Sequence, residues 1–343
     1  MEQTAEPGTV QIAEATHKLV APLFEVHALG GIEVKGKTEP VQAYRVLASS
    51  VQPGRQRGIA GLDSPMVGRD DEVARLRQIM RRAQQGNGQV VSIIGEAGIG
   101  KSRLIRELKA EWDGGWREMV APSVHTGRPY DSFQQQIRVA AGITPGETIV
   151  QARQKLGELL TGSFPHLSSA QPVFEMLLGI SDEDGGRIDG ETFKRDLFGL
   201  LQETTRQQVA QQPMVYVLDD VHLMDSASLE LENHILELAR ECSMLVILSY
   251  RPDREASIWR LREELRSEHA ERYTEVILQP LPAEQSEEMI DHLLATAELP
   301  ESLRSQILER ADGNPYFIEE IIRTLIELGQ VVRDDSGTVS YTH

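Results

Sequence analysis

Eight residues in the first third of the chain have the composition of a phosphate-binding loop. The segment GEAGIGKS, residues 95–102, matches G-x-x-x-x-G-K-[ST] at every fixed position. Glycines let backbone N–H groups point at phosphate oxygens, while Lys101 reaches the β- and γ-phosphates and the Ser102 hydroxyl binds Mg²⁺. An apolar run before the loop and a helical pattern after it supply the strand–loop–helix context that this chemistry needs. The alternative, a glycine-rich turn with a solvated lysine, does not explain that context.

Two aspartates follow a second apolar run, MVYVLDD (214–220). Asp219 stands at the end of an expected strand, where its carboxylate can reach a Mg²⁺ ion held by Ser102. Asp220, the next residue, would orient or deprotonate an attacking water. Solvated aspartates at a strand end are the alternative. The complete phosphate-binding loop upstream favours the metal-binding interpretation.

Three further polar residues lie near these aspartates in the sequence. Arg251 follows a third apolar run, MLVILSY (244–250), and could stabilise charge on a γ-phosphate. From spacing alone, an exposed arginine before a proline turn is equally consistent. His222 is expected to cap the chain locally or to support the aspartate pair, because phosphoryl transfer needs positioning more than a histidine base. Asp225 is expected to cap the helix that follows it.

The pattern of apolar residues predicts the elements that position these groups. A helix with Val73, Leu76, Met80 and Ala83 on one face precedes the first strand, QVVSIIG (89–95). Helical patterns, including those at 191–210 before the second strand and 226–240 after it, separate the three strands, which implies a parallel sheet covered on both faces. After Pro282 three helical patterns follow, and 329–343 resembles the start of a β-hairpin. The predicted fold class is α/β, a parallel-sheet P-loop NTPase core (65–280) with a helical lid (281–330).

The residues before the core have a different character. Residues 10–23 have helical spacing, and 24–48 alternate like strands, which predicts a small α+β segment over 1–48. Residues 49–64 are rich in Gly, Ser, Pro and Gln without periodicity, so we interpret them as a linker.

Composition narrows the class of protein. The formal net charge of −18 argues against a general binder of nucleic acid, although an acidic total can hide a local basic patch. The single cysteine, Cys242, suits a reducing compartment. No apolar run approaches the roughly 18 residues of a membrane span, and the N-terminus lacks the order of a signal peptide. We therefore predict a cytoplasmic protein that does not contact a membrane.

Together these motifs resemble the STAND class of P-loop ATPases, signal-transduction ATPases related to AAA+ proteins, over about residues 65–335. In MVGRDDEVARL (66–76) the resemblance places Val67, Gly68 and Arg69 against the adenine. GEAGIGKSRL (95–104) is similar to the family's Walker A motif. The resemblance implies nucleotide contacts from Gly95, Glu96, Ala97, Gly98, Ile99, Gly100, Lys101, Ser102 and Arg103.

The rest of the family pattern lies further along the chain. VLDDVHLMDSASLEL (217–231) resembles the Walker B motif D-D-x-H-W-A-D, but Leu223 and Met224 replace its Trp and Ala, so no role of that aromatic carries over. SYRPD (249–253) is similar to the strand end whose arginine senses the γ-phosphate, which favours that role for Arg251. DGNPYFIEE (312–320) resembles the lid motif that places a proline, here Pro315, on the adenine. Residues 331–343 resemble the start of a truncated winged-helix segment.

Residues 6–47 resemble the last part of a class III adenylate or guanylate cyclase catalytic domain. The metal-binding aspartates of that family lie upstream of this part, and residues 1–48 contain no aspartate. We therefore expect no cyclase activity, and the arrangement resembles a truncated cyclase–ATPase fusion.

The sequence thus predicts a bacterial signalling switch that binds ATP or ADP with Mg²⁺ and hydrolyses ATP slowly. Lys101, Asp219, Asp220 and Arg251 are the predicted catalytic residues, and Ser102 and Asp219 the metal ligands. The expected partners are the nucleotide and either other proteins or further copies of the chain in the ATP-bound state. Two alternatives stay open: a nucleotide-gated scaffold or transcription regulator without turnover, and a subunit of a nucleotide cyclase.

Overall fold

The computed structural model describes twelve parts of the chain, and these fall into two compact units, Met1–Asp63 and Ser64–His343. The described residues are 5, 9–14, 16–17, 24–32, 40–49, 65–121, 128–181, 190–253, 257–294, 299–328, 331–333 and 339–341. The first unit is a three-stranded antiparallel sheet of order β1-β3-β2, made of β1 (Val10–Ala13), β2 (Phe24–Ile32) and β3 (Val41–Ser49).

The predicted helix at 10–23 is wrong at its start, because residues 10–13 form β1 and the helical conformation begins at Glu14. Val10–Ala13 pair with Ala43–Val46, so the strand's backbone hydrogen bonds are made across the sheet, and tertiary pairing overrides the local spacing. The strands predicted over 24–48 are confirmed as β2 and β3. The predicted linker lies outside the described residues except for Ser49, which ends β3.

A five-stranded parallel sheet forms the centre of the second unit, with the order β5-β6-β7-β4-β8. Its strands are β4 (Gln89–Ile94), β5 (Gly115–Val120), β6 (Met214–Asp219), β7 (Met244–Tyr250) and β8 (Tyr273–Ile277). The three strands predicted from continuous apolar runs are β4, β6 and β7, which lie in the interior of the sheet. This confirms the predicted α/β fold class.

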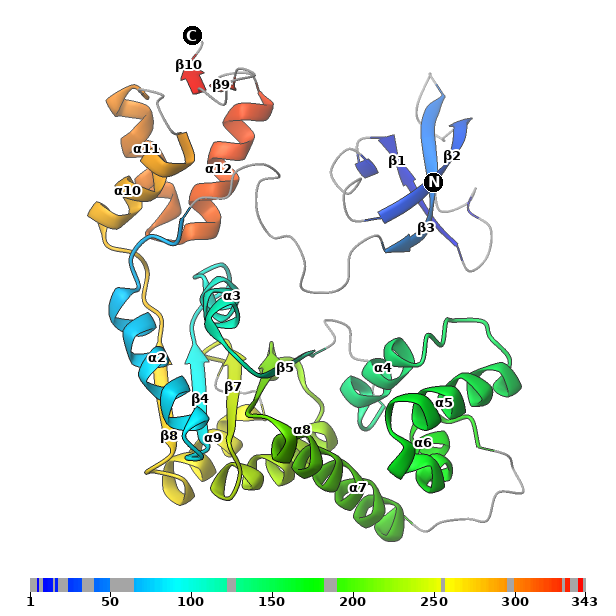
Figure 1. Ribbon diagram of the computed structural model, residues 1–343. Helices are drawn as coiled ribbons and strands as arrows, with labels where there is room; N and C mark the ends of the chain where they lie inside the picture. Colours follow the sequence, from blue (N-terminus) through cyan, green and yellow to red (C-terminus); the bar gives the residue numbers. More distant parts are fainter. Residues whose placement is uncertain are drawn as a thin grey trace. The chain divides into compact units, whose positions relative to one another are not determined.

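Helices cover both faces of this sheet (Figure 1). On one face, α2 (Asp70–Gln84) and α3 (Lys101–Glu111) pack on residues such as Val91 and Ile93. On the other face, α7 (Gly190–Gln211), α8 (Ser226–Leu236) and α9 (Ile258–Glu268) belong to the core that contains Val90 and Ile94. Since successive strand residues point to opposite faces, a strand between two helical layers is apolar throughout.

A group of helices between β5 and β6 extends the second of these cores. It comprises α4 (Asp131–Ala140), α5 (Ile149–Ser163), the 3₁₀ helix η2 (Pro165–Ala170) and α6 (Gln171–Leu178). Thr148 starts α5 with a capping box, in which its hydroxyl accepts from the Gln151 N–H.

The C-terminal part is helical, as predicted. It contains α10 (Ala283–Leu294), α11 (Glu301–Ala311) and α12 (Pro315–Glu327), which contact one another. The predicted hairpin is present as β9 (Val331–Arg333) and β10 (Val339–Tyr341), which pair antiparallel. Within the described ranges, no helix is both long enough and apolar enough to cross a lipid bilayer.

Candidate nucleotide-binding site

The predicted phosphate-binding loop connects β4 to α3 at the carboxyl edge of the sheet. Two of its glycines have left-handed backbone conformations, Gly98 with φ of 80° and Gly100 with φ of 103°. Gly95 is tightly enclosed, since a Cβ there would lie 2.7 Å from Ile99 Cγ2, and its N–H donates to the Tyr250 carbonyl at 3.2 Å. The loop therefore turns the chain sharply into the start of α3, whose free N–H groups form an anion-binding end.

Lys101 is the first residue of α3 and is only 7% exposed. Its Nζ donates to the carbonyl oxygens of Gly95 at 2.7 Å and Glu96 at 2.9 Å. Burial lowers the pKa of Lys101, and the nearby charges of Asp220 and Asp219 act in the opposite direction. The ammonium group is thus folded back over the loop, at the place where the pattern requires a cation for phosphate.

Ser102 and Asp219, which are 117 residues apart in sequence, meet at the edge of the sheet. The Ser102 hydroxyl donates to Asp219 Oδ2 at 3.2 Å, and the other oxygen of that carboxylate accepts from the Asp220 N–H at 3.0 Å. Asp220 has φ of 56°, a left-handed conformation that aspartate and asparagine tolerate better than most residues. A hydroxyl and a carboxylate so close together are a ligand pair suited to Mg²⁺.

His222 and Asp225 lie just beyond these aspartates, on and after the 3₁₀ helix η3 (Val221–Leu223). His222 Nδ1 is buried and has no hydrogen-bond partner within the described part of the chain, and burial lowers the pKa of His222. The predicted cap is confirmed, because Asp225 Oδ1 accepts from the Ser228 N–H at 2.9 Å. The same carboxylate also accepts from the N–H groups of Tyr130 and Asp131, so it holds the start of α4 as well.

Arg251 is exposed and directly follows Tyr250, whose carbonyl accepts from Gly95. Its positive charge lowers the pKa of both Lys101 and His222. Arg251 therefore stands at the same sheet edge as the loop and the aspartate pair, so that the loop, Asp219, Asp220 and Arg251 come together from three adjacent strands.

The residues predicted to lie against adenine connect the loop to the C-terminal helices. Val67 is buried, and Gly68 has φ of 65°, with the Gln285 side chain of α10 only 2.2 Å from the position of a Cβ. The Arg69 side chain is 10% exposed and donates to the carbonyls of Ile99 and Gln279. Hydrogen bonds to backbone thus occupy the Arg69 guanidinium.

The other predicted loop residues differ in exposure. Ile99 is 2% exposed and belongs to the core under α2 and α3, whereas Glu96, Ala97 and Ser102 are exposed. Arg103 is half-buried and pairs with Glu107 at 2.9 Å. The exposed residues are the ones that a phosphate chain could contact through their backbone.

The start of α12 lies directly on the loop. Asn314 Nδ2 donates to the Ala97 carbonyl at 2.9 Å, and the Tyr316 N–H approaches the Gly98 carbonyl at 3.3 Å. A Cβ at Gly98 would lie 2.6 Å from Tyr316 Cβ, so only glycine permits this approach. Pro315, between them, is half-buried. Sequence reasoning did not find the Asn314 contact, although an asparagine before a proline signals a helix cap.

The contact between Asn314 and the loop can be tested separately from the cap. Asn314→Ser keeps an oxygen that can cap α12 but is too short to reach Ala97, whereas Asn314→Ala loses both functions. We expect Asn314→Ser to loosen α12 by about 1 kcal/mol, so that its amides exchange about five-fold faster. Hydrogen exchange of the nucleotide-free protein measures this. Unchanged exchange in the serine variant would show that the contact does not hold the helix.

Comparison with known proteins agrees with this geometry. Residues 65–248, more than half of the chain, match the AAA ATPase domain family. The chain therefore belongs to that family of P-loop ATPases. Residues 282–338, which include the three C-terminal helices, match a domain family of unknown function.

One curated relative and several solved structures are similar to the chain. An uncharacterised protein of Rhizobium meliloti is 26% identical over 94% of this chain, which spans only 31% of that protein's length. A Walker-type ATPase of Pyrococcus abyssi shares 15% identity at a TM-score of 0.37, covering 77% of this chain and 73% of its own. A RuvB mutant of Thermotoga maritima shares 12% identity at a TM-score of 0.42, covering 78% of this chain and 68% of its own. A STAND protein with a tetratricopeptide repeat sensor from Pyrococcus horikoshii shares 16% identity at a TM-score of 0.36, covering 74% of this chain and 29% of its own. At these TM-scores the structural likenesses carry no argument about function.

Proposed function

We propose that this chain is a STAND-like signalling switch that binds ATP with Mg²⁺ and hydrolyses ATP slowly. The observation that carries the proposal is the 3.2 Å contact between the Ser102 hydroxyl and Asp219, next to a loop whose lysine is buried. Two residues so far apart in sequence meet at the carboxyl edge of a parallel sheet, where α/β folds bind their ligands.

The residues present suit a nucleoside triphosphate and a divalent ion. The N–H groups of 95–102 and the start of α3 would hold the phosphates, and Ser102 with Asp219 would hold Mg²⁺. Bound ATP supplies the phosphoryl group that is transferred to water. Asp220 orients that water and accepts its proton, and the guanidinium of Arg251 offsets charge on the phosphate oxygens.

The contacts of the C-terminal helices support a switching role. Asn314 bonds the Ala97 carbonyl, and Gln285 lies against Gly68. A nucleotide that reshapes the loop would change these contacts, and the helices would respond to whether ATP or ADP is present. We propose that this response exposes a surface for partner proteins or for further copies of the chain. We also propose, from the sequence resemblance, that residues 1–48 are a cyclase remnant without activity.

Lys101→Ala is expected to weaken nucleotide binding by about 1.5–3 kcal/mol, roughly one to two orders of magnitude in affinity, because it removes hydrogen bonds to charged phosphate. Titration of a fluorescent ATP analogue into the full chain measures the change. Lys109→Ala is the matched control, since Lys109 lies on the same helix with its side chain 51% exposed and paired to Glu118. Equal affinities of Lys101→Ala and the unmodified protein would contradict the proposed phosphate site.

A further inference from the structure

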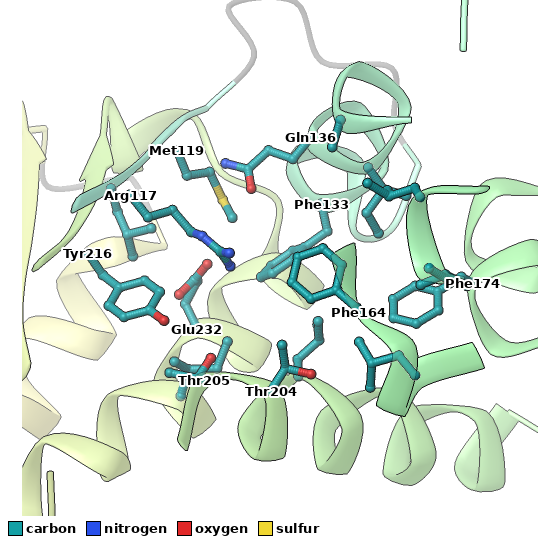
Figure 2. A pocket seen from close by; sticks show the side chains of 18 of the residues that line it. Arg117, Met119, Phe133, Gln136, Phe164, Phe174, Thr204, Thr205, Tyr216 and Glu232 are labelled. Carbon is teal, nitrogen blue, oxygen red and sulfur yellow. The ribbon is translucent and has the colours of Figure 1, made fainter. Parts of the chain in front are cut away.

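A cavity lies in the unit Ser64–His343, between the sheet and the helices inserted between β5 and β6. It has a volume of about 240 Å³ and is lined by residues of β5, β6, η2 and the helices α4 to α8. In Figure 2, Arg117 and Glu232 lie on one side of the cavity and Phe174 on the other, with Phe133 and Phe164 between them. An apolar pocket with a few convergent polar groups is the usual form of a small-molecule site.

Glu232 is the most unusual group in this lining. Its side chain comes from the apolar face of α8 and points into the cavity (Figure 2), and the residue is only 5% exposed. Across the described ranges, no hydrogen bond or ion pair holds its carboxyl group. Burial raises the pKa of Glu232 to about 8, against the opposing effect of the Arg117 charge. The Glu232 oxygens are not among the fully enclosed side-chain atoms without a partner, so they face the cavity, where a ligand can supply the hydrogen bond.

Arg117 determines the charge that the cavity accepts. Its guanidinium is directed toward Glu232 in Figure 2, and its Cζ lies 5.8 Å from the centre of the Tyr216 ring. The titratable residues of the lining are Arg117, Tyr216 and Glu232. Burial favours the protonated, neutral forms of Glu232 and Tyr216, and Arg117 is the basic residue of the lining. Arg117 is half-buried and forms no ion pair with the residues that the structure describes, so its guanidinium favours an anionic ligand over a cationic one.

We propose that this cavity binds a small apolar monocarboxylate, with its carboxylate on Arg117 and Glu232 and its body among the phenylalanines. The carboxylate accepts from the guanidinium and from the protonated carboxyl group, which gives Glu232 its missing partner. An apolar cavity of about 150 Å³ holds one benzene molecule. The larger volume here, about 240 Å³, suits a body of two fused rings. The wall includes Leu218, which precedes Asp219 in β6, so the ligand would contact the strand that carries the metal-binding carboxylate.

The test is a calorimetric titration of the full, nucleotide-free chain with three probes that have nearly the same shape but different charge. These are 2-naphthoate, 2-naphthalenemethanol and 2-naphthylmethylamine. We expect saturable 1:1 binding of the carboxylate, at least tenfold weaker binding of the alcohol, and no binding of the amine. Because no nucleotide is present, the result is independent of the proposed ATPase site.

Two variants test the assignment of the site. Arg117→Met is expected to weaken naphthoate binding at least tenfold, whereas Arg260→Met, at a side chain that is 89% exposed on α9, is expected to leave it unchanged. Ala140→Trp, at the exposed end of α4 where it lines the cavity, fills the space and is expected to abolish binding even if Arg117→Met fails to fold. Absence of naphthoate binding, amine binding as tight as carboxylate binding, or full binding by the Ala140→Trp variant would each overturn the proposal.

Discussion

Asp220→Asn is expected to reduce ATP hydrolysis by about 10²–10⁴-fold, the usual worth of a positioned general base, while Mg²⁺–ATP binding stays within about three-fold. The two aspartates have different surroundings. Asp219 accepts from Ser102 through Oδ2. Asp220 donates its N–H to Asp219, and its side chain makes no hydrogen bond to the residues that the structure describes. Asparagine also accepts the left-handed backbone at φ of 56°, so the substitution does not strain the loop.

Phosphate release under excess ATP and titration with an ATP analogue together test this division of roles. Asp219→Asn is the comparison, and it is expected to impair both binding and hydrolysis because it removes a metal ligand. Turnover of Asp220→Asn at the unmodified rate would place the base elsewhere. If the unmodified chain released no phosphate while binding ATP, the nucleotide-gated scaffold would replace the slow ATPase as its function.

Glu232→Gln is expected to raise the free energy of unfolding of the second unit by roughly 5 kcal/mol at high pH and to change it little near pH 4. The folded state holds the Glu232 proton up to a pKa of about 8, above the ordinary value of 4.5. Between these two values the unfolded chain has lost the proton and the folded chain has kept it. The contribution of Glu232 to the free energy of unfolding is therefore fully present below about pH 4.5, and it declines by about 1.4 kcal/mol per pH unit up to pH 8. Glutamine, which does not ionise, removes this decline.

Urea unfolding at pH 5, 7 and 9, followed by tryptophan fluorescence, measures the difference. All three tryptophans, Trp112, Trp116 and Trp259, belong to the unit Ser64–His343, so the signal reports that unit alone. Glu230→Gln is the matched control on the same helix, where the side chain is 56% exposed and paired with Lys194. It is expected to change stability by less than about 1 kcal/mol at every pH. Parallel pH profiles for Glu232→Gln and the unmodified protein would show that Glu232 is ionised in the folded state.

The sequence alone was sufficient to predict the features that depend on residues close together in the chain. The phosphate-binding loop is a local pattern, and β4, β6 and β7 are continuous apolar runs because both of their faces are buried. The helices after Pro282 have strong apolar periodicity, and the cap at Asp225 is a short-range contact. Each of these signals is complete within about twenty residues of chain.

Tertiary structure decided what depends on pairing over long distances. The edge strands GWREMV and YTEVI are half polar, because an edge strand has one neighbour and partial cover, so they carry no continuous apolar run. The bond from Asn314 to Ala97 joins residues 217 apart, and the meeting of Arg117 with Glu232 requires β5 and α8 to face one cavity. No local pattern encodes such meetings, since the order of strands in the sheet determines which distant side chains become neighbours. Residues 10–13 are a further example, because their pairing with β3 makes them a strand although their apolar spacing predicts a helix.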